Sequence, residues 1–142
     1  MTKPIVVITG ASGFIGSAVC VDLAKDCVVI AIDLREPSEQ LRKAAPQTTW
    51  HILDIAENQD ISEVFSLTRN DFGHIDLVIH LAAYYDFDND WVREYQRTNV
   101  DGTANVIEAS KNVGVKRLIF ARSIGAMEPP PGGSSLTEES PA

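Results

Sequence analysis

The feature that most constrains the fold of this chain is an apolar run followed at once by three glycines. Residues 5–8 read Ile-Val-Val-Ile, and such a run of mainly β-branched side chains suits a strand that is buried on both faces. The glycines follow at every third position, as Gly10, Gly13 and Gly16, and apolar residues recur at helical spacing over residues 15–23. The pattern predicts a strand, a glycine-rich turn and a helix in direct succession.

Each of the three glycines has a predicted task. Gly10 would let the chain turn tightly, Gly13 would let the backbone approach a pyrophosphate, and Gly16 would let the helix pack closely on the strand. The phosphates would meet the N–H groups and the positive dipole end at the start of the helix. The spacing Gly-x-x-Gly-x-x-Gly differs from the commoner Gly-x-Gly-x-x-Gly, so the interpretation needs support from the next strand.

A second buried strand, residues 28–33, closes on a carboxylate. Asp33 lies 23 residues after Gly10, near the spacing at which an acidic side chain binds the ribose hydroxyls of NAD. The alternative is a strand end that water solvates. Arg35, two residues later, could accept the 2′-phosphate of NADP, whereas the Asp33 carboxylate repels that phosphate. We therefore predict NAD as the cofactor, with NADP as the less favoured alternative.

The rest of the chain continues as alternating helices and strands. Apolar periodicity, prolines and glycine stops predict helices at about 38–45, 61–72 and 91–112 and strands at 48–53, 75–80 and 115–121. Five strands alternating with four helices predict an α/β fold, a doubly wound parallel sheet with strand order 3-2-1-4-5 and helices on both faces.

Polar and small residues fall at the predicted ends of these strands. Gly10, Asp33, Asp54, Ala82 and Ser123 all lie at or just beyond the carboxyl end of a predicted strand. In the predicted order the topological switch lies between the first and fourth strands, where the strand ends form a crevice that binds ligands. We therefore expect these five residues to meet at one edge of the sheet.

The composition changes near residue 128. Residues 1–127 are expected to form one dinucleotide-binding domain, which suits a chain of 142 residues. Residues 128–142 are rich in Pro, Gly, Ser and Glu and contain one large apolar residue, Leu136. We expect this segment to be a mobile tail that leads to a catalytic and substrate region outside this chain.

Charge and composition oppose several other functions. The net charge of −8 opposes binding to nucleic acid or to an anionic membrane surface. No apolar run approaches the roughly 18 residues of a membrane span, and the first strand begins too early for a secretory signal. Cys20 and Cys27 lack metal-ligand spacing, so we expect buried apolar thiols, no metal site and a reducing, cytoplasmic location.

Six stretches of the chain match a known pattern in order and in spacing. They are Thr-Gly-Ala-Ser-Gly-Phe-Ile-Gly at 9–16, Asp33, Asp54-Ile55, His-Leu-Ala-Ala at 80–83, Thr-Asn-Val-Asp-Gly-Thr at 98–103 and Leu-Ile-Phe-Ala-Arg-Ser at 118–123. With these motifs the chain resembles the extended short-chain dehydrogenase/reductases, the NAD-dependent epimerase/dehydratase family. The resemblance implies an NAD(P)-binding Rossmann fold and the N-terminal part of an epimerase, dehydratase or hydroxysteroid-type oxidoreductase that transfers hydride at nicotinamide.

The resemblance also implies how the dinucleotide would lie. Its pyrophosphate would lie over residues 10–16, with backbone contacts from Phe14 and Ile15, and Asp33 would bind the adenosine ribose. Asp54 and Ile55 would contact the adenine. The part of the dinucleotide that leads to the nicotinamide would lie along Leu81, Ala82 and Ala83.

Two further residues have a role by resemblance and a simpler alternative. Ser123 aligns with the active-site serine or threonine of the family. Arg122 and Met127, near it, depart from the usual pattern. The alternative for Ser123 is a hydroxyl at the end of a strand with no catalytic role. Asn99 would be a structural or proton-relay residue near the nicotinamide, and the alternative is an internal hydrogen bond. Residues 84–91 either touch substrate or form a solvated acidic loop.

The general acid of the family is missing from these residues. It is the tyrosine of a Tyr-x-x-x-Lys motif about two dozen residues past the serine, and that position lies beyond Ala142. We therefore expect this chain alone to bind dinucleotide weakly or not at all and to lack ordinary turnover, while the complete enzyme acts on a small-molecule substrate. The alternatives are a non-catalytic dinucleotide-sensing module and a structural subunit. A homodimer through the uncovered edge of the last strand is a further hypothesis.

Overall fold

The computed structural model describes residues 2–86, 91–123, 127, 128, 130, 132 and 135–140. Its strands are β1 (Ile5–Thr9), β2 (Val28–Asp33), β3 (Thr49–Ile52), β4 (Leu77–His80) and β5 (Arg117–Phe120). Its helices are α1 (Phe14–Leu23), α2 (Glu39–Ala44), α3 (Asn58–Phe72), the π-helical η1 (Tyr95–Gly102) and α4 (Thr103–Asn112). Within these described ranges, no helix has the length and apolarity that crossing a bilayer requires.

The strands form one parallel sheet in the order β3-β2-β1-β4-β5. This confirms the predicted doubly wound sheet and its strand order. Thr9 at the end of β1 lies level with Ile32 of β2 and with His80 of β4. The residues that follow these three strands therefore meet at the carboxyl edge of the sheet.

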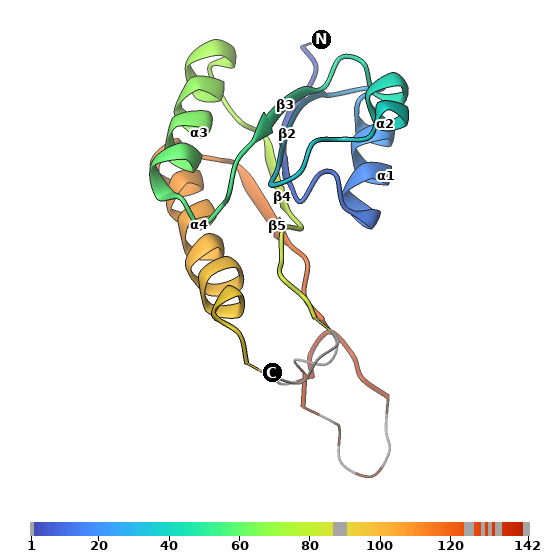
Figure 1. The fold of residues 1–142 in the computed structure, drawn as a ribbon, viewed down its shortest axis with the longest axis vertical. Helices are drawn as coiled ribbons and strands as arrows, with labels where there is room; N and C mark the ends of the chain where they lie inside the picture. The colour runs from blue at the N-terminus through green and yellow to red at the C-terminus, as the bar shows by residue number, and fades with distance from the viewer. Residues whose placement is uncertain are drawn as a thin grey trace.

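Helices cover the sheet on both faces. Figure 1 shows α1 and α2 on one face and α3 and α4 on the other. All five residues of β1 are buried, because alternate side chains enter different halves of the core. Val7 packs in a cluster with Phe65 of α3 and Val106 of α4, whereas Ile8 packs in a second cluster with Cys20 of α1.

Local signals placed most element ends within a few residues. The Ser38 hydroxyl accepts a hydrogen bond from the Leu41 N–H at 3.1 Å and so caps α2, and Gly73 ends α3 in the left-handed conformation at φ +79°. The predicted strand at 75–80 is shorter than expected and pairs only from Leu77. Just before it, the Asp76 N–H donates to the Ile5 carbonyl at 2.9 Å, and the Asp76 carboxylate accepts the Ile5 N–H at 2.8 Å.

The prediction of a continuous α-helix over 91–112 is only partly correct. Its second half is α4, but Tyr95–Gly102 forms η1, in which the helical turn is wider. The wider turn lets three consecutive side chains, those of Arg97, Thr98 and Asn99, face the carboxyl edge of the sheet. Their contacts with the segments after β3 and β4 account for this departure from α-helical geometry.

The predicted tail, residues 128–142, is described only in part, and its mobility and the domain boundary at 127 stay predictions. Within the described part, the Thr137 N–H donates to Ser140 Oγ at 3.0 Å and the Ser140 N–H donates to the Thr137 carbonyl at 3.1 Å. These two hydrogen bonds close a single turn.

Candidate functional site

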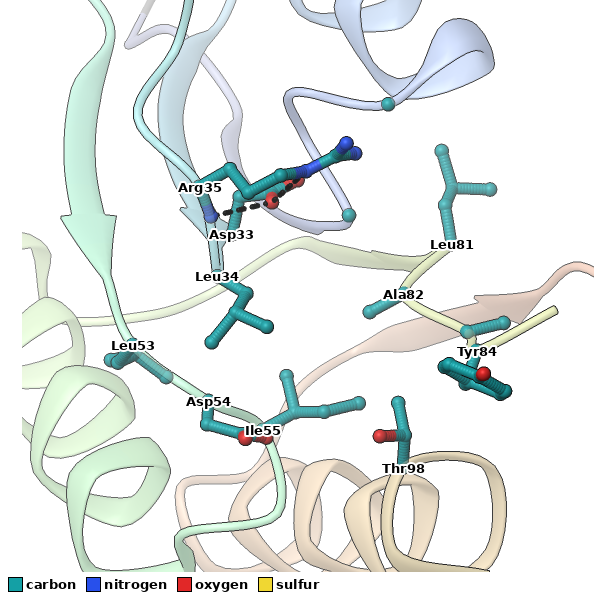
Figure 2. A pocket seen from close by; sticks show the side chains of 13 residues that line it. Asp33, Leu34, Arg35, Leu53, Asp54, Ile55, Leu81, Ala82, Tyr84 and Thr98 are labelled. Atoms are coloured by element: carbon teal, nitrogen blue, oxygen red, sulfur yellow. Dashed lines mark hydrogen bonds and ion pairs between the residues drawn. The ribbon is translucent and has the colours of Figure 1, made fainter. Parts of the chain in front are cut away.

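Two neighbouring clefts open at the carboxyl edge of the sheet. The first, called here the rim cleft, has a volume of about 260 Å³ and is lined by Gly10, Gly13, Asp33, Leu34, Arg35, Leu53, Asp54, Ile55, Leu81, Ala82, Ala83, Tyr84 and Thr98 (Figure 2). The second, called the serine cleft, has a volume of about 390 Å³ and is lined by His80, Leu81, Ala82, Ala83, Tyr84, Tyr85, Asn99, Thr103, Phe120, Ala121, Arg122 and Ser123. The clefts share residues 81–84, so a ligand that crosses this segment reaches both.

The structure brings most of the predicted site residues together. Those in the rim cleft are Gly10, Gly13, Asp33, Arg35, Asp54, Ile55, Leu81, Ala82 and Ala83. Asn99 and Ser123 line the serine cleft instead. Phe14, Ile15 and Gly16 line neither cleft but form the first turn of α1, where the Phe14 side chain is 97% exposed.

The glycine turn is pressed against the segment that follows β4. Gly10 has φ +69°, and a Cβ atom on it would lie 2.6 Å from the amide nitrogen of Ala82. A Cβ atom on Gly16 would lie 2.1 Å from the Gly10 carbonyl oxygen. These contacts confirm the tight turn at Gly10 and the close packing at Gly16. A Cβ atom on Gly13 would meet only the Gly10 carbonyl, at 3.1 Å, so its task at a pyrophosphate stays a prediction.

The start of α1 offers backbone donors beside the rim cleft. Gly13 is the N-cap residue and supplies no side-chain oxygen, so the first N–H groups of the helix have no capping partner from it. The first turn of α1, which the structure describes in full, carries no acidic side chain. Such a helix start favours an anion through its N–H groups and its dipole.

The Asp33 carboxylate joins the loop after β2 to the glycine turn. It is only 7% exposed, and its Oδ2 atom accepts the Ser12 N–H at 2.8 Å while its Oδ1 atom accepts the Arg35 N–H at 3.0 Å. Each oxygen retains acceptor capacity for a further donor. The Arg35 Nε atom lies 4.0 Å from Oδ1, and its side chain is 75% exposed at the mouth of the cleft.

Ser12 is a residue that sequence reasoning missed. Besides its backbone N–H to Asp33, its hydroxyl donates to the Arg35 carbonyl at 3.1 Å. Its position inside the glycine motif was the available signal, because small polar residues in turns commonly bond to neighbouring backbone.

The Asp54 carboxylate lies across the rim cleft from Asp33 (Figure 2). Its Oδ1 atom accepts the Ala56 N–H at 2.9 Å, and its Oδ2 atom pairs with the guanidinium of Arg97. Arg97 also donates to Glu57 Oε1 at 2.6 Å. The hydrogen bonds to Asp54 and then to Glu57 raise the pKa of Arg97. Sequence reasoning missed Arg97, because it lies 43 residues from Asp54 and belongs to no motif.

Apolar side chains form the walls between these two carboxylates. Figure 2 shows Leu34, Ile55 and Ala82 around the same space. Ile55 is 5% exposed and packs tightly beneath η1, since a Cβ atom on Gly102 would lie 2.7 Å from it. The rim cleft therefore combines a flat apolar interior with acceptor groups at two ends.

Asn99 makes an internal hydrogen-bond pair. Its Oδ1 atom accepts the Tyr84 N–H at 2.7 Å, and its Nδ2 atom donates to the Tyr84 carbonyl at 2.9 Å. The structure thus contains the internal hydrogen bonds of the simpler alternative, and they hold the segment that both clefts share. The role of Asn99 near a nicotinamide stays a prediction. Ser123 is exposed in the serine cleft, beyond the end of β5.

His80 lies at the end of β4 and is 1% exposed. Its Nδ1 atom is 2.6 Å from Thr9 Oγ1, and its Nε2 atom is 2.9 Å from Thr103 Oγ1. Thr9 Oγ1 also accepts the Ala82 N–H at 3.3 Å. Burial lowers the pKa of His80 from 6.5 to about 4, so the ring is neutral near pH 7. His80 thus ties the end of β1 to α4 in the packed interior.

Residues 84–91 of the predicted loop include 87–90, which lie outside the described residues. In the described part, Tyr95 contacts two aromatic rings, edge-on with Tyr84 at 5.1 Å and stacked with Trp91 at 5.6 Å between centroids. The Tyr84 hydroxyl donates to Asp86 at 3.2 Å. The choice between a substrate contact and a solvated loop stays open.

The order of the sheet, the glycine turn and the carboxylates after β2 and β3 define a class of protein. These are α/β domains of the Rossmann type, with a ligand site at the topological switch point. The model of the NAD dependent epimerase/dehydratase family matches residues 6–142, and the chain belongs to that family.

Individual relatives agree with this family. The chain is 34% identical to the L-arabinose 1-dehydrogenase (NAD(P)(+)) of Haloferax volcanii, over 82% of this chain and 39% of that protein. It is 30% identical to UDP-glucose 4-epimerase 2 of Oryza sativa subsp. japonica, over 96% of this chain and 35% of that protein. The chain therefore spans well under half the length of these relatives.

Solved structures show the same fold. The UDP-N-acetylglucosamine 4-epimerase of Methanobrevibacter ruminantium M1, solved with UDP-N-acetylmuramic acid, has a TM-score of 0.79 and 26% identity over 99% of this chain and 44% of that one. The UDP-glucose 4-epimerase of Thermus thermophilus, solved with NAD, has a TM-score of 0.73 and 27% identity over 96% of this chain and 43% of that one.

Proposed function

We propose that this chain binds a nicotinamide dinucleotide across the rim and serine clefts, as the cofactor-binding part of an NAD-dependent oxidoreductase or epimerase. The observation that carries the proposal is the buried Asp33 carboxylate held against the Gly10 turn inside the rim cleft. The turn brings Gly10 and Gly13 to the wall of this cleft, and Gly13 has no side chain that would keep a phosphate from the backbone. The epimerase solved with NAD, which shares this fold, supports the same assignment.

The phosphates of the ligand fit the start of α1. The helix begins at Phe14, directly after the turn, and its first N–H groups can donate to phosphate oxygens. The exposed side chains of Phe14 and Ile15 point away from the packed core, so their backbone N–H groups rather than their side chains would hold the pyrophosphate.

The two nucleoside ends fit the two clefts. Asp33 would accept hydrogen bonds from the ribose hydroxyls, and the apolar walls beside Asp54 would enclose the adenine. Ala82 and Ala83 have small side chains and would let the other end of the dinucleotide pass into the serine cleft toward Ser123. When bound, the nicotinamide would supply hydride acceptance and donation, and the Ser123 hydroxyl would hold a substrate oxygen near it.

We propose NAD rather than NADP as the preferred form. A ribose 2′-phosphate here would place a negatively charged group beside the Asp33 carboxylate, which is only 7% exposed. Arg35 opposes this effect, because its guanidinium lies at the cleft mouth and can pair with a phosphate. Asp33 is the more buried of the two, and its charge is therefore less screened.

This chain alone is proposed to lack turnover. None of Tyr84, Tyr85 and Tyr95 has a lysine four residues later, so the 142 residues contain no Tyr-x-x-x-Lys pair. Arg122 beside Ser123 supports the alternative of a dinucleotide-sensing module without catalysis. The coding DNA past residue 142 distinguishes the two: a Tyr-x-x-x-Lys motif there indicates a truncated enzyme, and its absence favours such a module.

A small-molecule substrate, a cytoplasmic location and homodimer formation belong to the same proposal. Ile119 and Phe120 of the edge strand β5 are 47% and 52% exposed, which supports association through this edge. Gel filtration at rising concentration tests the dimer, and a monomer at every concentration would count against it.

Ligand-observed NMR titration tests the proposed function, because it detects weak complexes. We expect weak but saturable binding of NAD by the chain and still weaker binding of NADP. The variant Asp33→Asn should lose most NAD binding, whereas Asp22→Asn, a matched change at an exposed position on α1, should not. No saturable binding of either dinucleotide by the unaltered chain would overturn the proposal.

A further inference from the structure

We propose that Arg97 is a positioning residue: it fixes the Asp54 carboxylate, which the resemblance assigns to the adenine, and so strengthens the preference of the rim cleft for a purine that carries an amino group. The inference rests on the proposed function, since it concerns the base end of the same dinucleotide. It adds a residue on η1, outside the sequence motifs, to the determinants of ligand choice.

The Asp54 carboxylate is held at both of its oxygens. Oδ1 accepts the Ala56 N–H at 2.9 Å, and Oδ2 pairs with the Arg97 guanidinium. The two contacts come from different sides, one from its own loop and one from η1. They fix the plane of the carboxylate and leave each oxygen with acceptor capacity toward the cleft.

The surroundings of Asp54 suit a flat ring with a donor at its edge. Leu34, Leu53 and Ile55 line this part of the rim cleft with apolar atoms. Both oxygens of this carboxylate act as hydrogen-bond acceptors, from the Ala56 N–H and from the Arg97 guanidinium. The amino group of adenine can donate to the carboxylate, whereas the carbonyl oxygen of hypoxanthine at the same ring position would face a like partial charge.

Arg97 is itself held in place from its outer side. Its second guanidinium nitrogen donates to Glu57 Oε1 at 2.6 Å, and its side chain is 38% exposed, compared with 59% for Glu57. The guanidinium thus bridges an outer and an inner carboxylate. If Arg97 is removed, Asp54 keeps its backbone contact to Ala56 but can rotate about it and become hydrated.

The experiment compares NAD with its deamino analogue, in which hypoxanthine replaces adenine, by NMR titration of the 142-residue chain. We expect the unaltered chain to bind NAD about tenfold more tightly than the analogue, as a hydrogen bond to a charged group allows. R97M keeps the aliphatic stem and removes the charge, and it should reduce this ratio to about twofold or less. E63Q, which removes a charge at an exposed position of α3 that lines neither cleft, should keep the ratio.

Thermal melting of each variant separates a loss of selectivity from a loss of folding. If R97M does not fold, R97K takes its place. The ratio of its affinities for NAD and for the analogue should lie between about twofold and the ratio of the unaltered chain, because an ammonium lacks the planar fork of arginine. A folded arginine variant with the full ratio, or an unaltered chain with no preference, overturns the inference alone. Failure of the unaltered chain to bind either dinucleotide overturns the proposed function as well.

Discussion

The backbones of Gly10 and Ala82 lie so close together that no side chain fits between them. A Cβ atom on Gly10 would lie 2.6 Å from the amide nitrogen of Ala82, and the Gly10 backbone has φ +69°. The first turn and the segment after β4 are therefore in backbone contact, although 72 positions separate them in the sequence. This contact forms the base of the rim cleft, and it leads to the first prediction.

Gly10→Ala should destabilise the fold by about 3 kcal/mol or more, because the left-handed conformation and the backbone clash both act against it. Gly73→Ala is the matched control: Gly73 has φ +79°, but a Cβ atom there would have nothing within 4 Å. It should cost only about 1 kcal/mol. Urea unfolding measures both. Equal losses for the two variants would show that the contact with Ala82 adds nothing.

Gly102→Ala should destabilise the chain through Ile55, whose Cγ1 and Cδ1 atoms would lie 2.7 and 2.8 Å from the new Cβ atom. Because these are side-chain atoms, Ile55→Ala should relieve the clash. The double variant should then be at least about 1 kcal/mol more stable than the sum of the two single changes predicts. A double-mutant cycle by chemical denaturation measures this coupling, and additive losses would contradict the packing of η1 on Ile55.

Stability should fall as the pH drops from 6.5 toward 4, because of His80. Its pKa is lowered by burial from 6.5 to about 4, so the unfolded chain takes up a proton in this range while the folded chain does not. The loss should be about 2 kcal/mol between pH 7 and pH 5 and should level off below pH 4. Urea unfolding at each pH measures it.

His80→Asn provides the control for that pH dependence. Burial also lowers the pKa of His51, so a smaller loss in the same direction should persist in the variant. Asp76 has a lowered pKa through its hydrogen bonds to Lys116 and to the Ile5 N–H, and its contribution is lost only at more acidic pH. If the stability of His80→Asn falls between pH 7 and pH 5 as steeply as that of the unaltered chain, His80 does not cause the pH dependence.

Asp33→Asn should shift the preference of the rim cleft from NAD toward NADP. The change removes the charge that repels the 2′-phosphate, and it retains an oxygen for one of the two backbone donors, Ser12 or Arg35. We expect the ratio of NAD to NADP affinity to fall about tenfold or more. Arg35→Ala should move the ratio in the opposite direction. Binding titrations with both dinucleotides give the ratios, and identical ratios in all three proteins would contradict the assignment of Asp33 to the ribose.

Much of the fold could be read from local patterns in the sequence. Strand and helix periodicity, the prolines on either side of α2 and the Gly73 stop placed nearly every element, because these signals depend on residues within one or two turns. The alternation of strands and helices predicted a parallel, doubly wound sheet, and the observed order is one that is common in such folds. The glycine turn was also predictable, since glycine is the residue that most readily adopts a positive φ, as Gly10 does.

The pairings inside the site depended on the folded sheet. The contacts of Arg97 with Asp54, of Asn99 with Tyr84 and of Gly102 with Ile55 join segments that periodicity cannot relate. The π-helical geometry of η1 belongs with them, because contacts to two separate loops favour it over an α-helix. The sequence by itself thus determined the elements and the turn that can hold a phosphate, whereas the tertiary structure decided which side chains hold the carboxylates in place. Propensity acts between neighbours in the chain, but these hydrogen bonds exist only once distant strands have paired.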